Sequence, residues 1–325
     1  MNFNDCLENL LPPVSPMKIS SGVDRYGFSN ILASSCCLHM IPRSFANWVH
    51  GWVWHEEPNP ELLACSKLPR DLVIVVRNEI EEKALHNDGF KDVRIGGLPF
   101  AYVNHQHDLR FDDMLLAIPA HSSESKKMIA DQQDYLNYLE SLKNDFERVY
   151  VSIFYLDVGG AMHEAVLGRG LHVIQGARPD DANSLLRMRA IFDAFEYVTS
   201  NVMGSHMLYS LFSGCCFSFC GPLYSYDESF ILGVNNPLGH SSDYARLLLD
   251  IQSEPYLRKR FGRFYVDNPR NGIKDSSFAE EAIGVKRLMH IDEIKDALGW
   301  SIAGQVRGYS KGAYRRFKRL IGINI

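Results

Sequence analysis

Several features that would assign a chain to a common class are missing from this sequence. No apolar run approaches the roughly 18–20 residues of a bilayer-spanning helix, and we expect no signal peptide, because the N-terminal segment lacks a basic and an apolar region. The net charge of −5 argues against general nucleic-acid binding. The pattern G-x-x-x-x-G-K-[ST] does not occur, and neither G-x-G-x-x-G nor G-x-S-x-G follows a predicted strand. P-loop phosphate binding, dinucleotide redox chemistry and α/β-hydrolase catalysis therefore have no support.

Patterns of metal ligands are scarce as well. No cysteine has C-x-x-C spacing matched by a second such motif, so we expect no zinc site. Asp112 and Asp113 precede a predicted strand rather than following one, which is a poor position for a metal. We expect neither a metal nor a bound cofactor. The cysteines lie mostly in apolar runs and are predicted to be buried, reduced thiols of a cytosolic protein: Cys6, Cys36, Cys37, Cys65, Cys215, Cys216 and Cys220.

The length of 325 residues is natural for two α/β domains. Apolar and charged contents of 46% and 22% are ordinary for a soluble globular protein. A first β-α-β element is predicted, with strands at 72–76 and 93–95 and a helix between Asn78 and Gly89. We place the junction of the two domains in residues 104–110.

A second series of strands and helices follows the junction. Strands are predicted at 114–118, 149–155, 171–174, 196–198 and 215–219, and helices at 128–142, 164–167, 182–192 and around Gly204. This alternation predicts an open parallel sheet with helices on both faces. Residues 225–300 are expected to be mainly helical and irregular.

Ligands of open α/β sheets bind at the carboxyl ends of the strands, where loops meet helix N-termini. Three loops of the second series carry small polar side chains and glycines, and we expect them to form one phosphate or nucleotide pocket. The candidates are His121, Ser122 and Ser123; Gly176 and Arg178; and Thr199, Ser200, Asn201, Gly204, Ser205 and His206. Three alternatives remain open: simple capping in the first loop, an ion pair of Arg178 with Asp180 or Asp181, and a core position for His206.

An aromatic segment at 45–57 is the main candidate of the first domain. If it were a strand, Trp48, Trp52 and Trp54 would share one face with His50. Tryptophan faces stack well on sugar rings, so these three residues are candidates for binding an acceptor. His50 is the preferred general base, with Glu56 as the second candidate. An aromatic core strand that ends in a solvated acidic loop is the alternative.

The last 25 residues, 301–325, contain no acidic residue. Basic residues alternate there with apolar ones, which is typical of a cationic amphipathic helix. Residues 307–321 would then suit contact with an anionic membrane surface. A helix that packs back on the first domain with its charges in water is the alternative.

Residues 110–222 resemble the donor-binding half of GT-B glycosyltransferases, in particular those of bacterial capsule and O-antigen synthesis. The resemblance lies in residues 199–206, Tyr209, Gly214, Gly221 and Pro222, and in 75–78 through 97–100. It covers about two thirds of the chain and implies two Rossmann-like domains with a central cleft and C-terminal helices packing back. The implied division is 1–107 for the acceptor side, 108–300 for the donor side and 301–325 for a basic helix.

The resemblance implies a cytoplasmic glycosyltransferase of surface polysaccharide synthesis, and a peripheral location at the inner face of the cell membrane is left open. A nucleotide sugar would serve as co-substrate and a glycan or lipid-linked molecule as acceptor, and no metal would be needed. The chain lacks the E-x7-E element of many retaining members, and its first domain is short, so donor and stereochemistry stay open. Pyruvyl transfer and non-catalytic glycan binding are the alternative functions.

Overall fold

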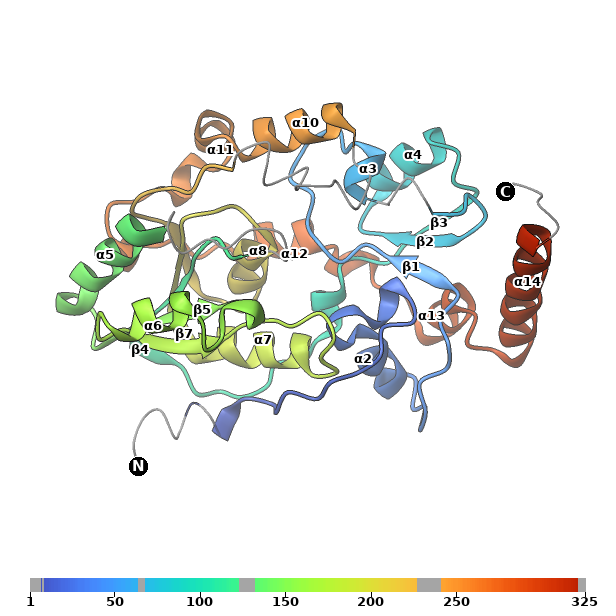
Figure 1. The fold of residues 1–325 in the computed structure, drawn as a ribbon, viewed down its shortest axis with the longest axis horizontal. Coiled ribbons are helices and arrows are strands. Elements are labelled where there is room, and N and C mark those ends of the chain that lie inside the picture. Colours follow the sequence, from blue (N-terminus) through green and yellow to red (C-terminus); the bar gives the residue numbers. More distant parts are fainter. Residues whose placement is uncertain (1–6, 8, 64–67, 123–131, 227–240, 321–325) are drawn as a thin grey trace.

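The computed structural model describes residues 7, 9–63, 68–122, 132–226 and 241–320 (Figure 1). Within these residues the strands form two parallel sheets, one of three strands and one of five. The chain is therefore a mixed α/β protein, as its alternating pattern predicts. Ser123, Cys6 and Cys65 lie outside the described residues.

The smaller sheet has the order β1-β2-β3, formed by Ala46–Trp48, Val73–Val76 and Asp92–Ile95. Ile74 and Val76 pack on one face with helices α3 (Pro60–Leu63) and α4 (Glu79–Asn87), whereas Val75 packs on the other. Asn78 caps α4 as predicted, because its side chain accepts hydrogen bonds from the N–H groups of Ile80 and Glu81. The predicted aromatic strand is shorter than expected, since β1 ends at Trp48.

The larger sheet has the order β6-β5-β4-β7-β8. Its strands are β4 (Phe111–Ile118), β5 (Arg148–Ile153), β6 (His172–Gln175), β7 (Phe195–Ser200) and β8 (Cys216–Phe219). The chain moves outward from β4 to β6 and then returns to the other side of β4, so the order reverses between β4 and β7. The five predicted strands are confirmed, but Thr199 and Ser200 belong to β7 rather than to a turn.

Helices cover both faces of the larger sheet. Successive side chains of β4 alternate: Leu115 packs with α5 (Gln133–Ser141) and α6 (Ala161–Leu167), whereas Leu116 packs with α7 (Ser184–Ala194) and α8 (Ser205–Phe212). The second of these clusters continues past α2 (Phe28–Ser35) to Trp48 of the smaller sheet and to Phe100, which follows that sheet in the chain. The two sheets therefore share one core, and the boundary at 107/108 stays a prediction.

The C-terminal helices return to the smaller sheet. After α12 (Ser276–Ile283), helix α13 (Ile291–Leu298) is held there by the bond from Phe45 N to Leu298 O, 3.0 Å, and by the Arg94–Asp296 ion pair, 2.7 Å. The part of the molecule around the smaller sheet is called the first lobe, and the part around the larger sheet the second lobe. Helices α10 (Ser242–Gln252) and α11 (Glu254–Phe261) run along the upper side of both lobes (Figure 1). Short 3-10 helices lie at Gly22–Gly27, Pro99–Tyr102, Leu142–Asn144, Tyr155–Asp157, Gly262–Phe264, Pro269–Asn271 and Val285–Arg287.

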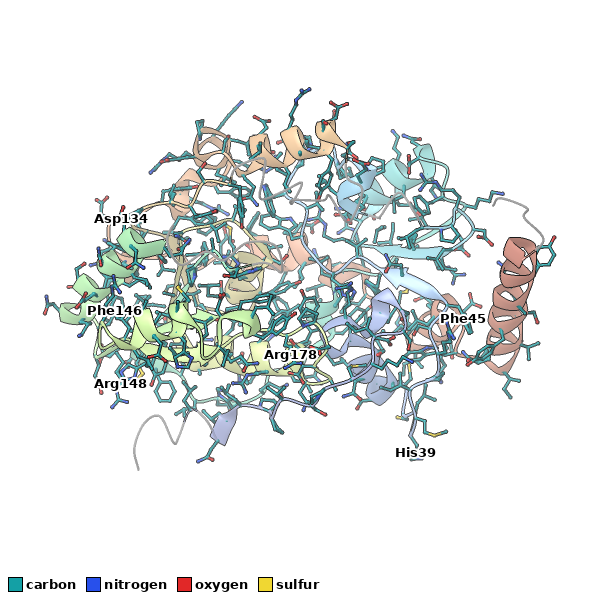
Figure 2. All side chains as sticks on the ribbon, in the orientation of Figure 1. His39, Phe45, Asp134, Phe146, Arg148 and Arg178 are labelled. Carbon is teal, nitrogen blue, oxygen red and sulfur yellow. The ribbon has the colours of Figure 1, made fainter. Side chains whose placement is uncertain are left out.

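The basic tail is helical, as α14 (Ile302–Leu320), and stands at one end of the molecule (Figure 1). It packs on the first lobe through Phe45 (Figure 2), whose ring lies 5.3 Å from that of Tyr309 and against the backbone of Gly308. Ile302 and Val306 remain 88% and 64% exposed. Packing on the first lobe thus accounts for part of the helix, and membrane contact stays a prediction. None of the described helices has the length and apolar character that a bilayer crossing takes.

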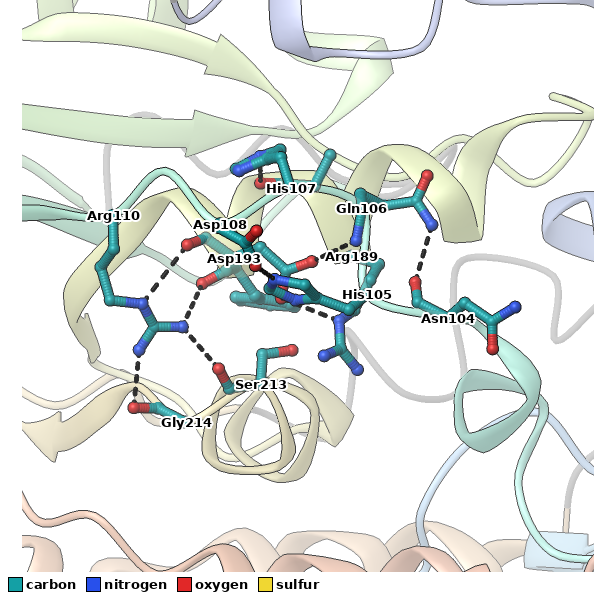
Figure 3. A network of polar contacts seen from close by, with 12 residues as sticks. Asn104, His105, Gln106, His107, Asp108, Arg110, Arg189, Asp193, Ser213 and Gly214 are labelled. Carbon is teal, nitrogen blue, oxygen red and sulfur yellow. Dashed lines mark hydrogen bonds and ion pairs between the residues drawn. The ribbon is translucent and has the colours of Figure 1, made fainter.

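The junction at 104–110 is anchored rather than loose (Figure 3). The Arg110 guanidinium donates to the carbonyl oxygens of Ser213, 2.5 Å, and Gly214, 2.7 Å, just beyond the end of α8. The same side chain contacts the carbonyl oxygens of Phe192 and Asp193 at the end of α7. One side chain therefore satisfies carbonyl groups at two helix C-termini.

Asp193, whose side chain is fully buried, is the second anchor of the junction. Its carboxylate accepts hydrogen bonds from Gln106 N, 2.9 Å, and from Arg189 Nε, 2.9 Å, and lies 3.1 Å from the His105 ring. A buried carboxylate with these partners ties the junction to α7.

We expect Asp193→Asn to lower the free energy of unfolding by about 3 kcal/mol, because it leaves Arg189 without its buried counter-charge. Urea unfolding followed by circular dichroism measures the change. Asp108→Asn is the matched control, since the fully exposed Asp108 carboxylate also contacts His105 and should matter by less than about 0.5 kcal/mol. Equal effects of the two substitutions would contradict the anchoring role of Asp193.

Candidate functional site

The order of the larger sheet reverses between β4 and β7, and the loops that follow these two strands meet. Ala120 N donates to Asn201 Oδ1 at 3.0 Å, and Asn201 Nδ2 donates to Gln132 Oε1 at 2.9 Å. Two of the three predicted loops thus lie side by side at the point where open α/β sheets bind ligands. Ser122 is buried beside Asp157, and His121 is exposed.

Thr199 and Ser200 are fully buried. Thr199 Oγ1 donates to Ser218 O at 3.2 Å, and Ser200 Oγ donates to Ile118 O at 2.6 Å. These hydroxyls join the ends of β4, β7 and β8. They have backbone partners already and do not face an open pocket.

His206 donates from Nε2 to Ser200 Oγ, 3.0 Å away. Burial lowers the pKa of His206 to about 4. The ring is therefore neutral near pH 7 and brings no positive charge to a phosphate. This arrangement matches the alternative in which His206 is a core histidine that is hydrogen-bonded to a neighbouring side chain.

Aromatic and charged side chains continue the rim of the larger sheet. The His121 ring stacks on Phe154 at 4.3 Å, Phe154 contacts Tyr155 at 4.6 Å, and the Arg178 guanidinium lies 5.3 Å from the Tyr155 ring. Arg178 also forms a two-point ion pair with Asp180, at 2.6 and 2.9 Å. A phosphate would have to compete with Asp180 for that guanidinium.

Gly176 is required by packing. A Cβ atom there would lie 2.7 Å from Ser152 Oγ, and Gly176 N donates to Ile153 O at 3.0 Å. The glycine therefore allows β5 and β6 to end side by side.

The first turn of α8 contacts the loop that follows β1. Trp52 N donates to Ser205 Oγ at 2.8 Å, and the Tyr209 hydroxyl donates to His50 O at 2.8 Å. Gly204 is the N-cap of α8 and offers no side chain to accept hydrogen bonds from its first turn. A site candidate of the first lobe therefore lies directly against the positive end of a helix of the second.

His50 has one ring nitrogen engaged and one without a partner. Nε2 donates to Gly22 O, which leaves the lone pair on Nδ1. Nδ1 is buried and has no hydrogen-bond partner among the described residues. Burial lowers the pKa of His50 to about 4, so the ring is neutral near pH 7 and able to accept a proton.

Arg25 is a site residue that the sequence did not reveal. It lines a cavity of about 340 Å³ with His50, Gly51 and Asn47, and no described carboxylate lies within ion-pair distance of it. The next residue, Tyr26, has φ 60°, a left-handed conformation that is uncommon for an aromatic residue. Its N–H donates to Pro179 O at 2.8 Å and its ring contacts His50. The fold, not a local motif, brings Arg25 to this cavity.

The three tryptophans are core residues in this structure. Trp48 is fully buried and donates from Nε1 to Gly97 O at 2.8 Å. Trp52 and Trp54 are 6% and 8% exposed, and Trp54 Nε1 donates to Ile251 O at 2.8 Å. The segment does not continue as a strand and instead packs under α10 and α11, so the condition for a shared aromatic face is not met. The burial of the three tryptophans matches the alternative of an aromatic core, although all three also line the cavity of His50 and Arg25.

Glu56 lies at the exposed end of this segment, as that alternative predicts. Its side chain is 79% exposed and pairs with Arg260 at 2.6 Å. His50, which is covered and has a free nitrogen lone pair, remains the preferred base candidate, and Glu56 stays the second.

Within the described residues, no group of three or more His, Cys, Asp or Glu side chains is placed to hold a metal ion. All cysteines of this part are free thiols; Cys36, Cys215 and Cys220 are buried, whereas Cys37 is exposed, which the sequence did not predict.

No family model matches the chain, and no curated protein matches its sequence. Three solved structures are similar over 82% of the chain, each at 10% identity: TarM (TM-score 0.36), the pneumococcal O-GlcNAc transferase GtfA in complex with UDP and GlcNAc (0.34), and the GtfA/B complex (0.31). The chain spans about half the length of these chains, 52%, 53% and 53%. Similarity this low carries no weight for the function of this chain.

The two neutral histidines predict acid sensitivity. The pKa values of His50 and His206 are lowered to about 4 in the folded protein, from 6.5. The unfolded chain therefore binds more protons between pH 6.5 and 4, and the free energy of unfolding should fall across that window by roughly 3 kcal/mol for each histidine.

Urea unfolding measured from pH 7 to pH 4 tests this prediction. His206→Gln should flatten the dependence, because glutamine does not titrate. An unchanged slope in the variant would show that His206 does not have a lowered pKa.

Proposed function

We propose that the chain is a glycosyltransferase that transfers a sugar from a nucleotide-sugar donor to a glycan or lipid-linked acceptor. The observation that carries the proposal is the pair of hydrogen bonds between residues 50–52 and α8, from Trp52 N to Ser205 Oγ and from the Tyr209 hydroxyl to His50 O. They hold residues 50–52, which include His50 with its unpartnered Nδ1, against α8, whose uncapped N-terminus is suited to hold a leaving phosphate.

In this proposal the acceptor hydroxyl gives its proton to His50 Nδ1, and the hydroxyl oxygen bonds to the anomeric carbon of the donor. The bond between that carbon and the diphosphate oxygen breaks. The N–H groups of the first turn of α8, with Gly204 and Ser205, stabilise the charge that develops on the diphosphate. Because Nδ1 is buried, the acceptor reaches it only when residues around it, Arg25 and Tyr26 among them, move.

The donor would lie along the carboxyl edge of the larger sheet. A cavity of about 270 Å³ opens there, lined by Asn201 and by Tyr224, Glu254 and Tyr265 among others. His121 and Arg178 lie on the same edge and remain donor candidates. Thr199, Ser200 and His206 would support this edge from inside, because their side chains bond to neighbouring strands and to one another.

Four further parts of the proposal rest on the motif resemblance and on the basic tail: a role in surface polysaccharide synthesis, a reaction without metal, a cytoplasmic location, and contact of α14 with an anionic membrane. The acceptor would enter through the cavity that His50 and Arg25 line together with the three tryptophans. Glycan binding by the tryptophans alone is not favoured, since these side chains are at most 8% exposed.

Nucleotide binding tests the donor assignment. One of UDP, GDP, CMP and dTDP should raise the melting temperature, since a ligand at a hundred times its dissociation constant adds roughly 2.7 kcal/mol of stability. The responding nucleotide names the donor class. No response to any of them, with a response to phosphoenolpyruvate, would replace sugar transfer by pyruvyl transfer.

Measurements of turnover test the roles proposed for His50 and Ser205. His50→Gln should lower kcat by about 10²-fold or more, because it removes the proposed base. Ser205→Ala should lower kcat as well, because it removes the acceptor of the Trp52 hydrogen bond that joins the two halves of the site. Circular dichroism checks that both variants fold, and Ser277→Ala, a change at an exposed hydroxyl of α12, is the control. Unchanged transfer in both variants would remove this site assignment.

A further inference from the structure

A third cavity, of about 440 Å³, lies where β2 ends and helices α11 and α12 approach the smaller sheet. Its lining includes three arginines, Arg77, Arg260 and Arg263, from two distant parts of the chain, and only one carboxylate, Glu56. None of these arginines belongs to the proposed transfer site described above.

The three guanidinium groups are held in place by their surroundings. Arg77 is 12% exposed, donates to Ala282 O at 3.1 Å, and has its Nε buried without a hydrogen-bond partner among the described residues. Arg263 lies over the rings of Phe264 and Phe278, at 4.8 and 5.2 Å.

Like charges are crowded around Arg77. Burial lowers its pKa, Glu81 opposes this effect, and the positive charges of Arg287 and Arg260 lower the pKa further. Carboxylates balance these cations in the structure: Arg77 pairs with Glu81, Arg260 with Glu56, and Arg287 with Glu79 and Glu281.

Two of the three carboxylate partners lie outside the cavity, so its described lining carries more positive than negative groups. Arg77 pairs with Glu81 and Arg263 with Asp275, but neither Glu81 nor Asp275 lines the cavity. The remaining carboxylate, Glu56, pairs with Arg260 through an exposed contact, which is easily exchanged for another anion.

We propose that this cavity is an anion-binding site and that its ligand is a phosphate group. Guanidinium groups that converge from different segments match the several oxygens of one phosphate, with short, charge-assisted hydrogen bonds. The apolar walls formed by Trp52 and Phe261 suit the group that carries the phosphate. If the proposed function holds, on which this further step rests, the phosphate belongs to the acceptor, because the cavity lies at the edge of the smaller sheet.

Calorimetric titration of the full chain at constant ionic strength tests the site without donor or turnover. Inorganic phosphate should bind, and Arg260→Gln and Arg263→Gln should each weaken binding about tenfold. Glu56→Gln should strengthen it, because it frees Arg260 and removes the competing negative charge. Arg77 is not used, since its buried pairing with Glu81 makes a folding defect the expected result.

Two variants serve as controls. Arg246→Gln removes an equal charge from an exposed position of α10 and should leave phosphate affinity unchanged. Ser205→Ala, in the proposed transfer site, reports phosphate that binds there instead of in the arginine cavity. Absence of phosphate binding, equal affinity of the arginine variants and the unaltered chain, or loss of binding only in Ser205→Ala would each overturn the proposal.

A hexose 6-phosphate and the corresponding neutral methyl hexoside separate the sources of the phosphate. Tighter binding of the hexose phosphate than of inorganic phosphate supports a phosphate carried by the acceptor. Equal binding supports the anion site and overturns the acceptor assignment. Because these measurements need no transfer reaction, failure of the anion site is distinct from failure of the proposed function.

Discussion

The hydrogen bonds between residues 50–52 and the first turn of α8 hold the carboxyl edges of the two sheets against each other. Neither edge makes a site by itself: one supplies a histidine with a free lone pair, and the other supplies an uncapped helix end. Arg110 and Asp193 fix the chain between the sheets, so the approach of the two edges is set by buried polar contacts and a shared core rather than by a loose linker.

Charge is distributed unequally over this region. Burial keeps His50 and His206 neutral, and Asp180 compensates Arg178 on the rim of the larger sheet. Positive charge without a described carboxylate close by remains at Arg25 and at the start of α8, and the cavity with three arginines has only Glu56 as a carboxylate in its described lining. An anionic substrate would meet favourable potential along the line where the two lobes join.

Helices α10 and α11 cover that line from one side. Trp54 bonds to the backbone of α10, and Glu56 pairs with Arg260 of α11, so the aromatic segment of the first lobe is packed beneath both helices. Because the two helices cover this segment, its tryptophans are core residues here, although tryptophan is a residue type that stacks well on sugar rings. The same helices contribute lining residues to the cavities on both sheet edges.

The order and type of the regular elements could be predicted from the sequence, because strand runs, the Asn78 cap and the turn glycines are local signals. The sequence also marked the loops after β4, β6 and β7, since the carboxyl ends of parallel strands share one edge. Only tertiary structure decided which side chains of those loops are open: Thr199 and Ser200 extend β7 and bond inward, and the tryptophans face a core formed by residues some 200 positions away. The cavities that Arg25 and the three arginines line form only on folding. Residues from distant segments that come together leave no local pattern in the sequence.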